Sequence, residues 1–189
     1  MRVINSDLDQ VLIIEPEPHI DSRGFFAEIY QARRYRSAGV ESDFVQDNIS
    51  FSQKGVLRGL HYQYPMQQAK LLQVLDGSVF DVALDIRLGS PTFGAWTGVE
   101  LSSHNHRQIY IPEGFSHGFY VLSQSALIMY KCSYFYSPES EGGVSWDDPD
   151  IAIDWPLSGD PLLSGKDASF PRLKDIPRDR LPIFKQKDA

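Results

Sequence analysis

Two histidines, a lysine and an arginine lie in two short runs that are bounded by turn residues. The first run reads Gly55-x5-His61-x-Gln63-x6-Lys70-x6-Gly77, with Arg58 three residues before the histidine, and the second reads Pro112-x-Gly114-x2-His117. An imidazole with a pKa near ~6.5 can take up a proton at neutral pH, and fixed cations can stabilise an oxyanion. These residue types therefore indicate acid–base chemistry on an anionic substrate or intermediate.

The composition of the chain is typical of one acidic globular domain. Its 189 residues, 42% hydrophobic and 12% aromatic, are enough for a core that buries about 70% of the unfolded surface. The net charge of −7 argues against nucleic acid or an anionic membrane as a bulk partner. Cys132, the only cysteine, excludes an intrachain disulfide framework, and neither a leader peptide nor a long apolar span is visible. We expect a single domain over residues 1–189 and a cytoplasmic location.

Turn residues divide the middle of the chain into short β-type runs. We predict strands at 45–52, 56–63, 70–76, 78–85, 95–101, 107–111, 117–122 and 126–134. An extended stretch from Val3 leads to a turn at 21–24, a strand over 25–30 and a short helix over 31–39. After Trp155 we predict loops and short helices, with residues 186–189 loose. The pattern predicts an all-β fold, an antiparallel jelly-roll barrel with short peripheral helices.

The two runs of the opening motif resemble the metal-binding motifs of cupin barrels, with two substitutions. A metal-binding cupin has a second histidine where Gln63 stands and a glutamate where Lys70 stands. An ammonium group in place of an anionic ligand should repel divalent cations. The nearby His104-Asn-His106 is also unsuitable, because no glutamate follows at the required short distance and the segment is typical of a polar turn. The sequence therefore predicts no metal site.

Eight sequence blocks, in order, resemble the dTDP-4-dehydrorhamnose 3,5-epimerase family over nearly the whole chain. They begin at residues 21, 44, 55, 80, 89, 111, 130 and 146 and read DSRGFF, FVQDN, GVLRGLHYQ, FDVALDIR, GSPTFG, IPEGFSHGF, YKC and WDDP. The resemblance implies a cupin-like jelly-roll homodimer that needs no cofactor. It also implies the substrate dTDP-4-dehydro-6-deoxy-D-glucose, which is inverted at C3 and C5 to give the L-rhamnose precursor.

The resemblance implies catalytic roles for a small group of residues. Because a ketone at C4 acidifies the hydrogens at C3 and C5, inversion needs a base, an acid on the opposite face and a group that holds the enolate oxygen. His61 resembles the base, Asp167 the carboxylate that orients it, and Tyr130 the acid. We expect Lys70 to face the C4 oxygen, with Arg58 as a second stabilising cation. From the sequence alone, the histidine and the tyrosine could also be core residues and the two cations exposed strand-edge residues.

Further positions resemble residues that hold the nucleotide sugar in the family. They are Arg23, Glu28, Gln46, Asn48, Arg58, Lys70, His117, Tyr136, Glu141 and Lys166. Arg23 and Glu28 match residues that reach the site from the neighbouring subunit. Tyr136 matches the aromatic ring that stacks on thymine, and an arginine fork suits diphosphate oxygens. Alternatively, His117 is a structural histidine after a turn and Tyr136 an ordinary tyrosine at a strand end.

Three other functions remain open on the sequence. A related epimerase would invert C3 alone or act on another nucleotide-linked deoxysugar. A jelly-roll module without catalysis would need the cations and aromatic rings, but no His–Asp pair. A metal-dependent cupin is disfavoured by Gln63 and Lys70. Double inversion is favoured, because Tyr130 together with His61 and Asp167 equips both faces of the sugar.

Overall fold

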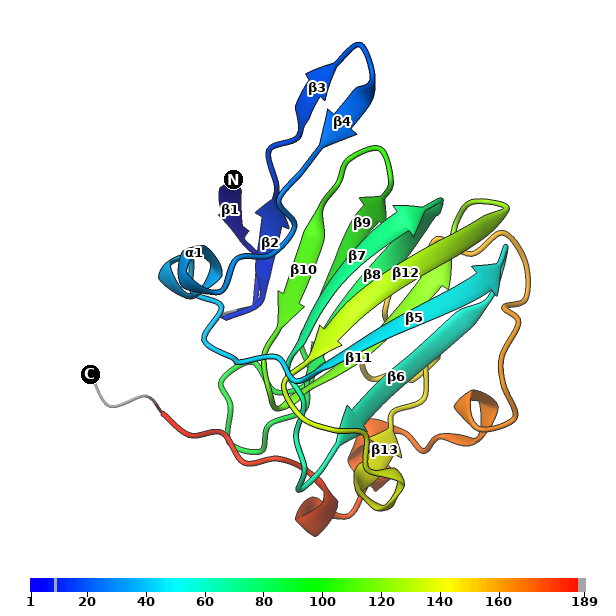
Figure 1. Ribbon diagram of the computed structural model, residues 1–189. Helices are drawn as coiled ribbons and strands as arrows, with labels where there is room; N and C mark the ends of the chain where they lie inside the picture. Colours follow the sequence, from blue (N-terminus) through cyan, green and yellow to red (C-terminus); the bar gives the residue numbers. More distant parts are fainter. Residues whose placement is uncertain (9, 187–189) are drawn as a thin grey trace.

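The computed structural model describes residues 1–8 and 10–186, and its centre is a sandwich of two β-sheets (Figure 1). The strands of the sandwich are β1 Arg2–Asn5, β2 Leu12–Glu15, β5 Gln46–Gln53, β6 Leu57–Gln63, β7 Lys70–Asp76, β8 Ser78–Asp85, β9 Trp96–Ser102, β10 Gln108–Ile111, β11 Phe115–Val121, β12 Ser125–Cys132 and β13 Glu141–Gly143. One sheet has the order β1-β2-β10-β7-β12-β5 and the other β13-β6-β11-β8-β9. Neighbouring strands in both sheets are antiparallel, so the predicted antiparallel jelly roll is confirmed.

The smaller elements lie at the edges of this sandwich. They are the hairpin β3 His19–Asp21 and β4 Gly24–Phe26, the helix α1 Ala32–Ser37, and the 3-10 turns η1 Pro138–Ser140, η2 Asp167–Ser169, η3 Leu173–Asp175 and η4 Arg178–Arg180. The predicted short helix and the predicted short helical turns after Trp155 are therefore present. Residues 187–189 of the predicted loose end lie outside the described residues. No helix of the described part of the chain is long and apolar enough to cross a membrane.

Each of the eight predicted central strands is present, with its ends shifted by two residues at most. The prediction of a strand over 25–30 is wrong beyond Phe26. The carbonyl of Ile29 accepts hydrogen bonds from the side chains of Tyr35 and Gln108 instead of pairing with another strand. The three-residue strand β13 was not predicted, because two of its residues are glycines, which are poor strand formers. It pairs with the edge of β6, where a Cβ on Gly142 would lie 2.6 Å from the Tyr62 ring.

Strand β8 is buried on both faces because each face meets a different apolar layer. Val79 and Ala83 point between the two sheets and belong to the central core. Val82 and Leu84 point outward, where the C-terminal tail covers them with Trp155 and other apolar side chains. Burying such a side chain fully contributes about 1.5–3 kcal/mol. The tail therefore stabilises the five-stranded sheet, and it also brings Asp167 into contact with His61 of β6.

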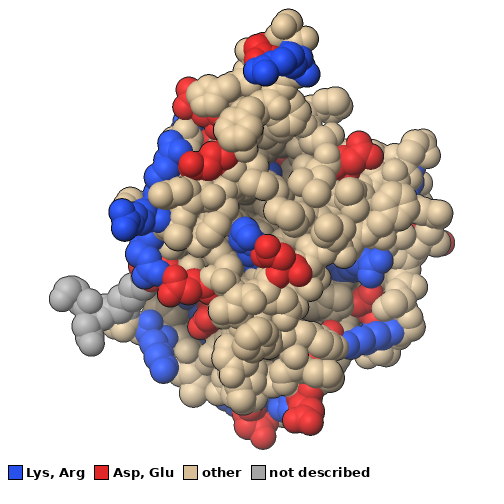
Figure 2. Space-filling view, in the orientation of Figure 1, with Lys and Arg blue, Asp and Glu red and all other residues tan. Residues whose placement is uncertain are grey.

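The outer face of the six-stranded sheet is only partly covered. Helix α1 packs Tyr35 against Ile14, Leu71 and Tyr110 at one side of it. Beyond this helix, Phe51 on β5 keeps 61% of its surface exposed, and several other apolar side chains of this face are also open. Figure 2 shows a broad area of uncharged surface over this sheet, with charged side chains at its centre and along its left side.

Candidate active site

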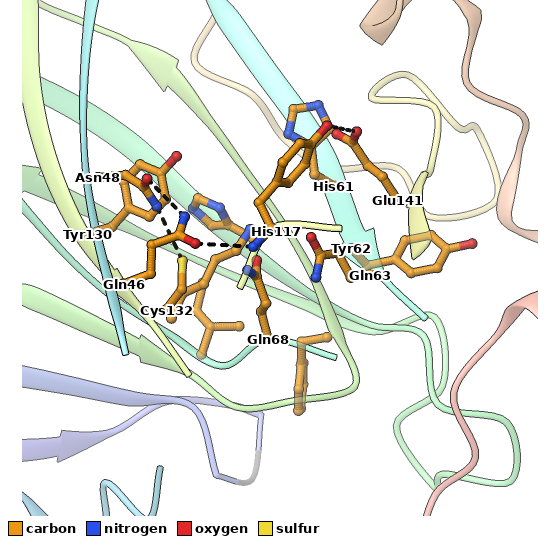
Figure 3. A pocket seen from close by; sticks show the side chains of 14 residues that line it. Gln46, Asn48, His61, Tyr62, Gln63, Gln68, His117, Tyr130, Cys132 and Glu141 are labelled. Atoms are coloured by element: carbon orange, nitrogen blue, oxygen red, sulfur yellow. Dashed lines mark hydrogen bonds between the residues drawn. The ribbon is translucent and has the colours of Figure 1, made fainter. Parts of the chain in front are cut away.

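One end of the sandwich holds a polar cavity in place of the apolar core. Its volume is about 270 Å³. The residues that line it come from both sheets, from the loop between β6 and β7 and from the segment after β12 (Figure 3): Gln46, Asn48, His61, Tyr62, Gln63, Gln68, Lys70, Ile111, Phe115, His117, Tyr130, Cys132, Tyr136 and Glu141. Eight of the predicted site residues are among them. The cavity is therefore where most of the predicted site comes together.

Strand register explains the wall that the six-stranded sheet contributes. Cys132 on β12 pairs with Gln46 of β5 on one side and with Lys70 of β7 on the other. Two residues earlier on β12, Tyr130 pairs with Asn48. Because side chains alternate between the two faces of a strand, residues two apart point to the same side of the sheet. These five side chains therefore form two adjacent rows that face the cavity.

A bulge in the five-stranded sheet aims His61 into the cavity. Between β6 and β11 the pairing shifts from Arg58 with Phe119 to His61 with His117, so three steps on one strand match two on the other. Such a bulge changes which face a following side chain points to. Gly59 lies inside it at φ +128°, and a Cβ there would lie 2.5 Å from the Cα of Gly118. Only glycine fits this close approach, which places two histidines opposite each other.

His61 is held by a buried carboxylate from the C-terminal tail. Its Nε2 lies 2.5 Å from Oδ1 of Asp167, while Ser164 donates a 2.8 Å hydrogen bond to Oδ2. Burial opposes ionisation of Asp167, but the hydrogen bonds from His61 and Ser164 outweigh it and hold the pKa of this carboxyl below its usual range. An ionised carboxylate only accepts hydrogen bonds, so Nε2 carries the ring proton. Nδ1 of His61 is left free to take up a proton.

His117 forms a similar pair with a carboxylate that the sequence analysis did not identify. Its Nε2 lies 3.1 and 3.0 Å from the two carboxylate oxygens of Asp81, and both side chains are buried. Burial is the largest influence on His117 and lowers its pKa. His117 could therefore be both a structural histidine and a residue that contacts substrate, since Asp81 anchors the ring and the ring still lines the cavity.

Burial shifts the pKa values of the other two predicted catalytic side chains in opposite directions, toward the neutral form in each case. Burial raises the pKa of Tyr130, so its phenol stays protonated and can act as a donor. Burial lowers the pKa of Lys70, and this amine makes no hydrogen bond or ion pair with the described residues. An anionic oxygen in the cavity would therefore give Lys70 a partner. Arg58 lies beside the cavity, where it donates a 3.0 Å hydrogen bond to Ser52 of the opposite sheet.

Three predicted binding residues meet at the rim. Tyr136 donates a 2.6 Å hydrogen bond to Glu141, and Lys166 forms an ion pair with the same carboxylate. Burial opposes ionisation of Glu141, but these two partners lower its pKa overall. Lys166 directly precedes Asp167. The rim contacts are therefore connected along the chain to the carboxylate that holds His61.

The side chain of Gln63, at a ligand position of metal-binding cupins, is bonded to backbone groups instead. Its Nε2 donates to the carbonyls of Met66 and Phe135, and its Oε1 accepts from the backbone N–H of Ser137. Both ends of the amide are thus used by backbone groups, and the next ligand position holds the ammonium of Lys70. These side chains do not fit a divalent cation. No cluster of His, Cys, Asp and Glu in the described part of the chain could hold a metal ion either.

Two predicted binding residues, Arg23 and Glu28, lie away from the cavity and its rim. Arg23 is at the tip of the β3–β4 hairpin, which projects from the sandwich (Figure 1). Its guanidinium is bonded to Asp21 at 2.6 Å, and 87% of its side chain is exposed. Glu28 pairs with Arg34 at 2.5 Å. Neither residue meets the other site residues within this chain.

Several residues that line the cavity were not predicted from the sequence. They are Tyr62, Gln68, Ile111, Phe115 and Cys132. Strand parity could have found Cys132, which is two residues from Tyr130, and Phe115, which is two residues from His117. Gln68 belongs to a loop, where it donates to the carbonyl of Tyr134, and no periodicity marks it.

Comparisons with known proteins show similarity to one enzyme family. The family model described as dTDP-4-dehydrorhamnose 3,5-epimerase matches residues 5–175. The dTDP-4-dehydrorhamnose 3,5-epimerase of Shigella flexneri is 51% identical over 177 residues, which are 93% of this chain and 97% of that protein. A crystal structure of the dTDP-6-deoxy-D-glucose-3,5-epimerase of Legionella pneumophila Philadelphia 1, in complex with dTDP-4-keto-L-rhamnose, is 55% identical with a TM-score of 0.96 and covers 98% of this chain and 99% of its own.

A relative with a narrower activity is also similar. A 3'-monoepimerase from Streptomyces bikiniensis, in complex with dTDP-quinovose, is 35% identical with a TM-score of 0.88 and covers 94% of this chain and 91% of its own. The resemblance of the eight sequence blocks is confirmed by these matches, which extend over nearly the whole chain. This chain belongs to the dTDP-4-dehydrorhamnose 3,5-epimerase family.

Proposed function

We propose that the chain converts dTDP-4-dehydro-6-deoxy-D-glucose to dTDP-4-dehydro-L-rhamnose by inverting C3 and C5. The observation that carries this proposal is the pair of His61 and Asp167 in the same cavity as Tyr130 and Lys70. This set contains an oriented base, a neutral acid and a cation without a partner. The Legionella relative, whose structure holds dTDP-4-keto-L-rhamnose, supports the choice of sugar.

Each inversion uses the same groups in the same order. Nδ1 of His61 takes the proton from the carbon next to the ketone, and the electron pair moves to the C4 oxygen to form an enolate. Lys70 stabilises this oxygen, and Asp167 stabilises the imidazolium that forms. Tyr130 then delivers its proton to the opposite face of the carbon. Solvent restores the phenol and removes the proton from His61 before the second carbon reacts.

The nucleotide is expected to lie at the rim. The ring of Tyr136 is 55% exposed, which leaves a face free for thymine, while its hydroxyl is fixed by Glu141. Lys166 supplies a cation at the same place. The two amides of Gln46 and Asn48, which are hydrogen-bonded to each other, add donors and acceptors for the sugar.

We expect Gln63→Ala to raise the KM for the nucleotide sugar about 10-fold with a smaller effect on kcat. The amide holds the backbone of residues 135 and 137 on either side of Tyr136, so its loss frees the segment that carries the stacking ring. Steady-state kinetics would measure the change. Gln124→Ala, in the turn between β11 and β12, is the matched control. An unchanged KM in the Gln63 variant would show that the hydrogen bonds from Gln63 to residues 135 and 137 do not position Tyr136.

We further propose that the protein is a homodimer in which the β3–β4 hairpin reaches the neighbouring subunit's cavity. The hairpin exposes Phe25 and Phe26, and the uncovered face of the six-stranded sheet exposes Ile49 and Phe51. Exposed apolar side chains of this number favour association. Arg23 would then leave Asp21 and bind the diphosphate of the partner's substrate, as the family resemblance implies.

Mixing two inactive variants tests this arrangement. Arg23→Ala and His61→Ala subunits, re-associated at random, should recover about a quarter of the wild-type activity, because half of the dimers carry one intact site. Each variant re-associated with itself is the control. If subunit exchange is demonstrated by mass spectrometry and no activity returns, Arg23 acts within its own subunit.

Incubation with dTDP-4-dehydro-6-deoxy-D-glucose in deuterated water tests the proposed function. We expect deuterium at both C3 and C5, together with the L-rhamno product, by NMR. Deuterium at C3 alone would instead identify a 3-epimerase, an outcome that similarity to the Streptomyces 3'-monoepimerase makes worth resolving. Binding of the sugar without any exchange would identify a non-catalytic module. If exchange occurs only with another nucleotide-linked ketosugar, the proposed substrate is wrong and the proposed mechanism still holds.

A further inference from the structure

The cavity contains a second His–Asp pair with the same atom pattern as the first. His117 and His61 are direct partners across β11 and β6. Each uses Nε2 to contact a carboxylate, Asp81 in one case and Asp167 in the other. In both rings Nδ1 makes no hydrogen bond with the described residues. Figure 3 shows the two rings in the same cavity.

Asp81 contacts His117 through its carboxylate, and its charge also opposes the lowering of the Lys70 pKa. It is fully buried on β8, between the core residues Val79 and Ala83. His117 is the only hydrogen-bond partner of its carboxylate among the described residues. A buried carboxylate is costly unless it is paired, so an apolar residue at this position would suit the packing better. A carboxylate at residue 81 is therefore best explained by its contact with the His117 ring.

The surroundings of His117 favour a neutral ring with one proton. Burial is the main reason why its pKa is lowered, and the charges of Lys70 and His61 act in the same direction, while Asp81 opposes them. A neutral imidazole has one N–H and one lone pair, and the hydrogen bond at one nitrogen decides where the proton is. A carboxylate only accepts, so the proton lies on Nε2.

We propose that Asp81 is a positioning residue that fixes the Nε2–H tautomer of His117, so that Nδ1 presents a lone pair to the sugar. This inference rests on the proposed function and deepens it. In that arrangement His117 accepts a hydrogen bond from a hexose hydroxyl and does not donate to the enolate oxygen. Stabilising the enolate is left to Lys70, and the hydroxyl contact orients the carbon that faces His61.

Nitrogen-15 NMR of the free protein tests the tautomer directly. At neutral pH the His117 ring should show a protonated Nε2 and an unprotonated Nδ1, with its signals assigned by their loss in His117→Ala. Asp81→Asn should reverse the pattern, because the amide can donate to Nε2 and leave the proton on Nδ1. A wild-type ring that is protonated on Nδ1, or on both nitrogens, would overturn the proposal without any need for a folded variant.

Kinetics with the nucleotide sugar test the consequence. Asp81→Asn should lower kcat/KM about 100-fold, because the pocket-facing acceptor becomes a donor. In a His117→Ala background the same change should have a much smaller effect, because that ring is the hydrogen-bond partner through which Asp81 mainly acts. Additive losses would show that Asp81 stabilises the fold or contacts substrate independently.

Asp85→Asn is the matched control for these experiments. Asp85 is also fully buried on the inner side of β8, but its partners are Arg87, Ser90 and Thr92. Its replacement should lower the thermal stability and leave the His117 tautomer as in the wild type. A tautomer change in both variants would mean that general loosening of β8, and not Asp81, controls the ring. Because the NMR result needs no substrate, failure of the proposed function and failure of this inference are distinguishable.

Discussion

His61→Ala is expected to slow the exchange of the C3 and C5 hydrogens by about 10⁴-fold, because the base that removes both protons is lost. The side chain of His61 is 30% exposed, against 8% for His117, and Asp167 keeps the ring proton on Nε2, so Nδ1 of His61 is the more accessible of the two free ring nitrogens in the cavity. Deuterium uptake by NMR or mass spectrometry gives the rate. Binding of dTDP, measured by calorimetry, should change little, since the rim residues Tyr136 and Lys166 are intact.

The control for this variant is His104→Ala, which removes an exposed histidine from the turn between β9 and β10. It should exchange both hydrogens at the wild-type rate. Substantial residual exchange at both carbons in His61→Ala would identify another base, and His117 would then be the first residue to test. Loss of exchange together with loss of dTDP binding would indicate that His61 supports the architecture of the cavity.

The sequence could predict the strands of this fold because turn residues mark their ends. It also predicted that His61, Lys70 and His117 come together, since the first two stand in one motif and the third in another, and all three line the cavity. Strand alternation then explains why Tyr130 and Lys70 share a wall. Those features are local, so they are visible in the order of the residues.

The rest of the site depends on contacts between distant segments. Asp167 meets His61 across 106 positions of the chain, and only the family resemblance pointed to this pair. The bulge at Gly59 was not predicted, because a glycine in a strand does not reveal which strand approaches it. Asp81 is hidden in an apolar run, and Gln63 serves backbone groups that the sequence does not place beside it. Arg23 and Glu28 need a second subunit before their predicted role can be examined.

Tyr130→Phe is expected to separate hydrogen exchange from inversion. His61 can still remove a proton and Lys70 can still hold the enolate, so deuterium should continue to enter C3 and C5. Without the phenol, however, the proton must return from the side on which it left. We expect the ratio of inversion to exchange to fall about 100-fold or more. NMR measures both quantities in one reaction, since the epimers and the deuterated positions give distinct signals.

The expected loss of inversion in Tyr130→Phe follows from the protonation state of the Tyr130 phenol. Burial raises the pKa of Tyr130, so the group holds its proton until an enolate needs it, and no hydrogen bond to another described residue competes for that proton. Tyr134→Phe removes a hydroxyl from an exposed ring two residues after β12 and should leave both rates unchanged. Equal loss of exchange and inversion in Tyr130→Phe would place this residue in the proton-removal step. Unchanged inversion would make it a packing residue, and the opposite face of the sugar would need another acid.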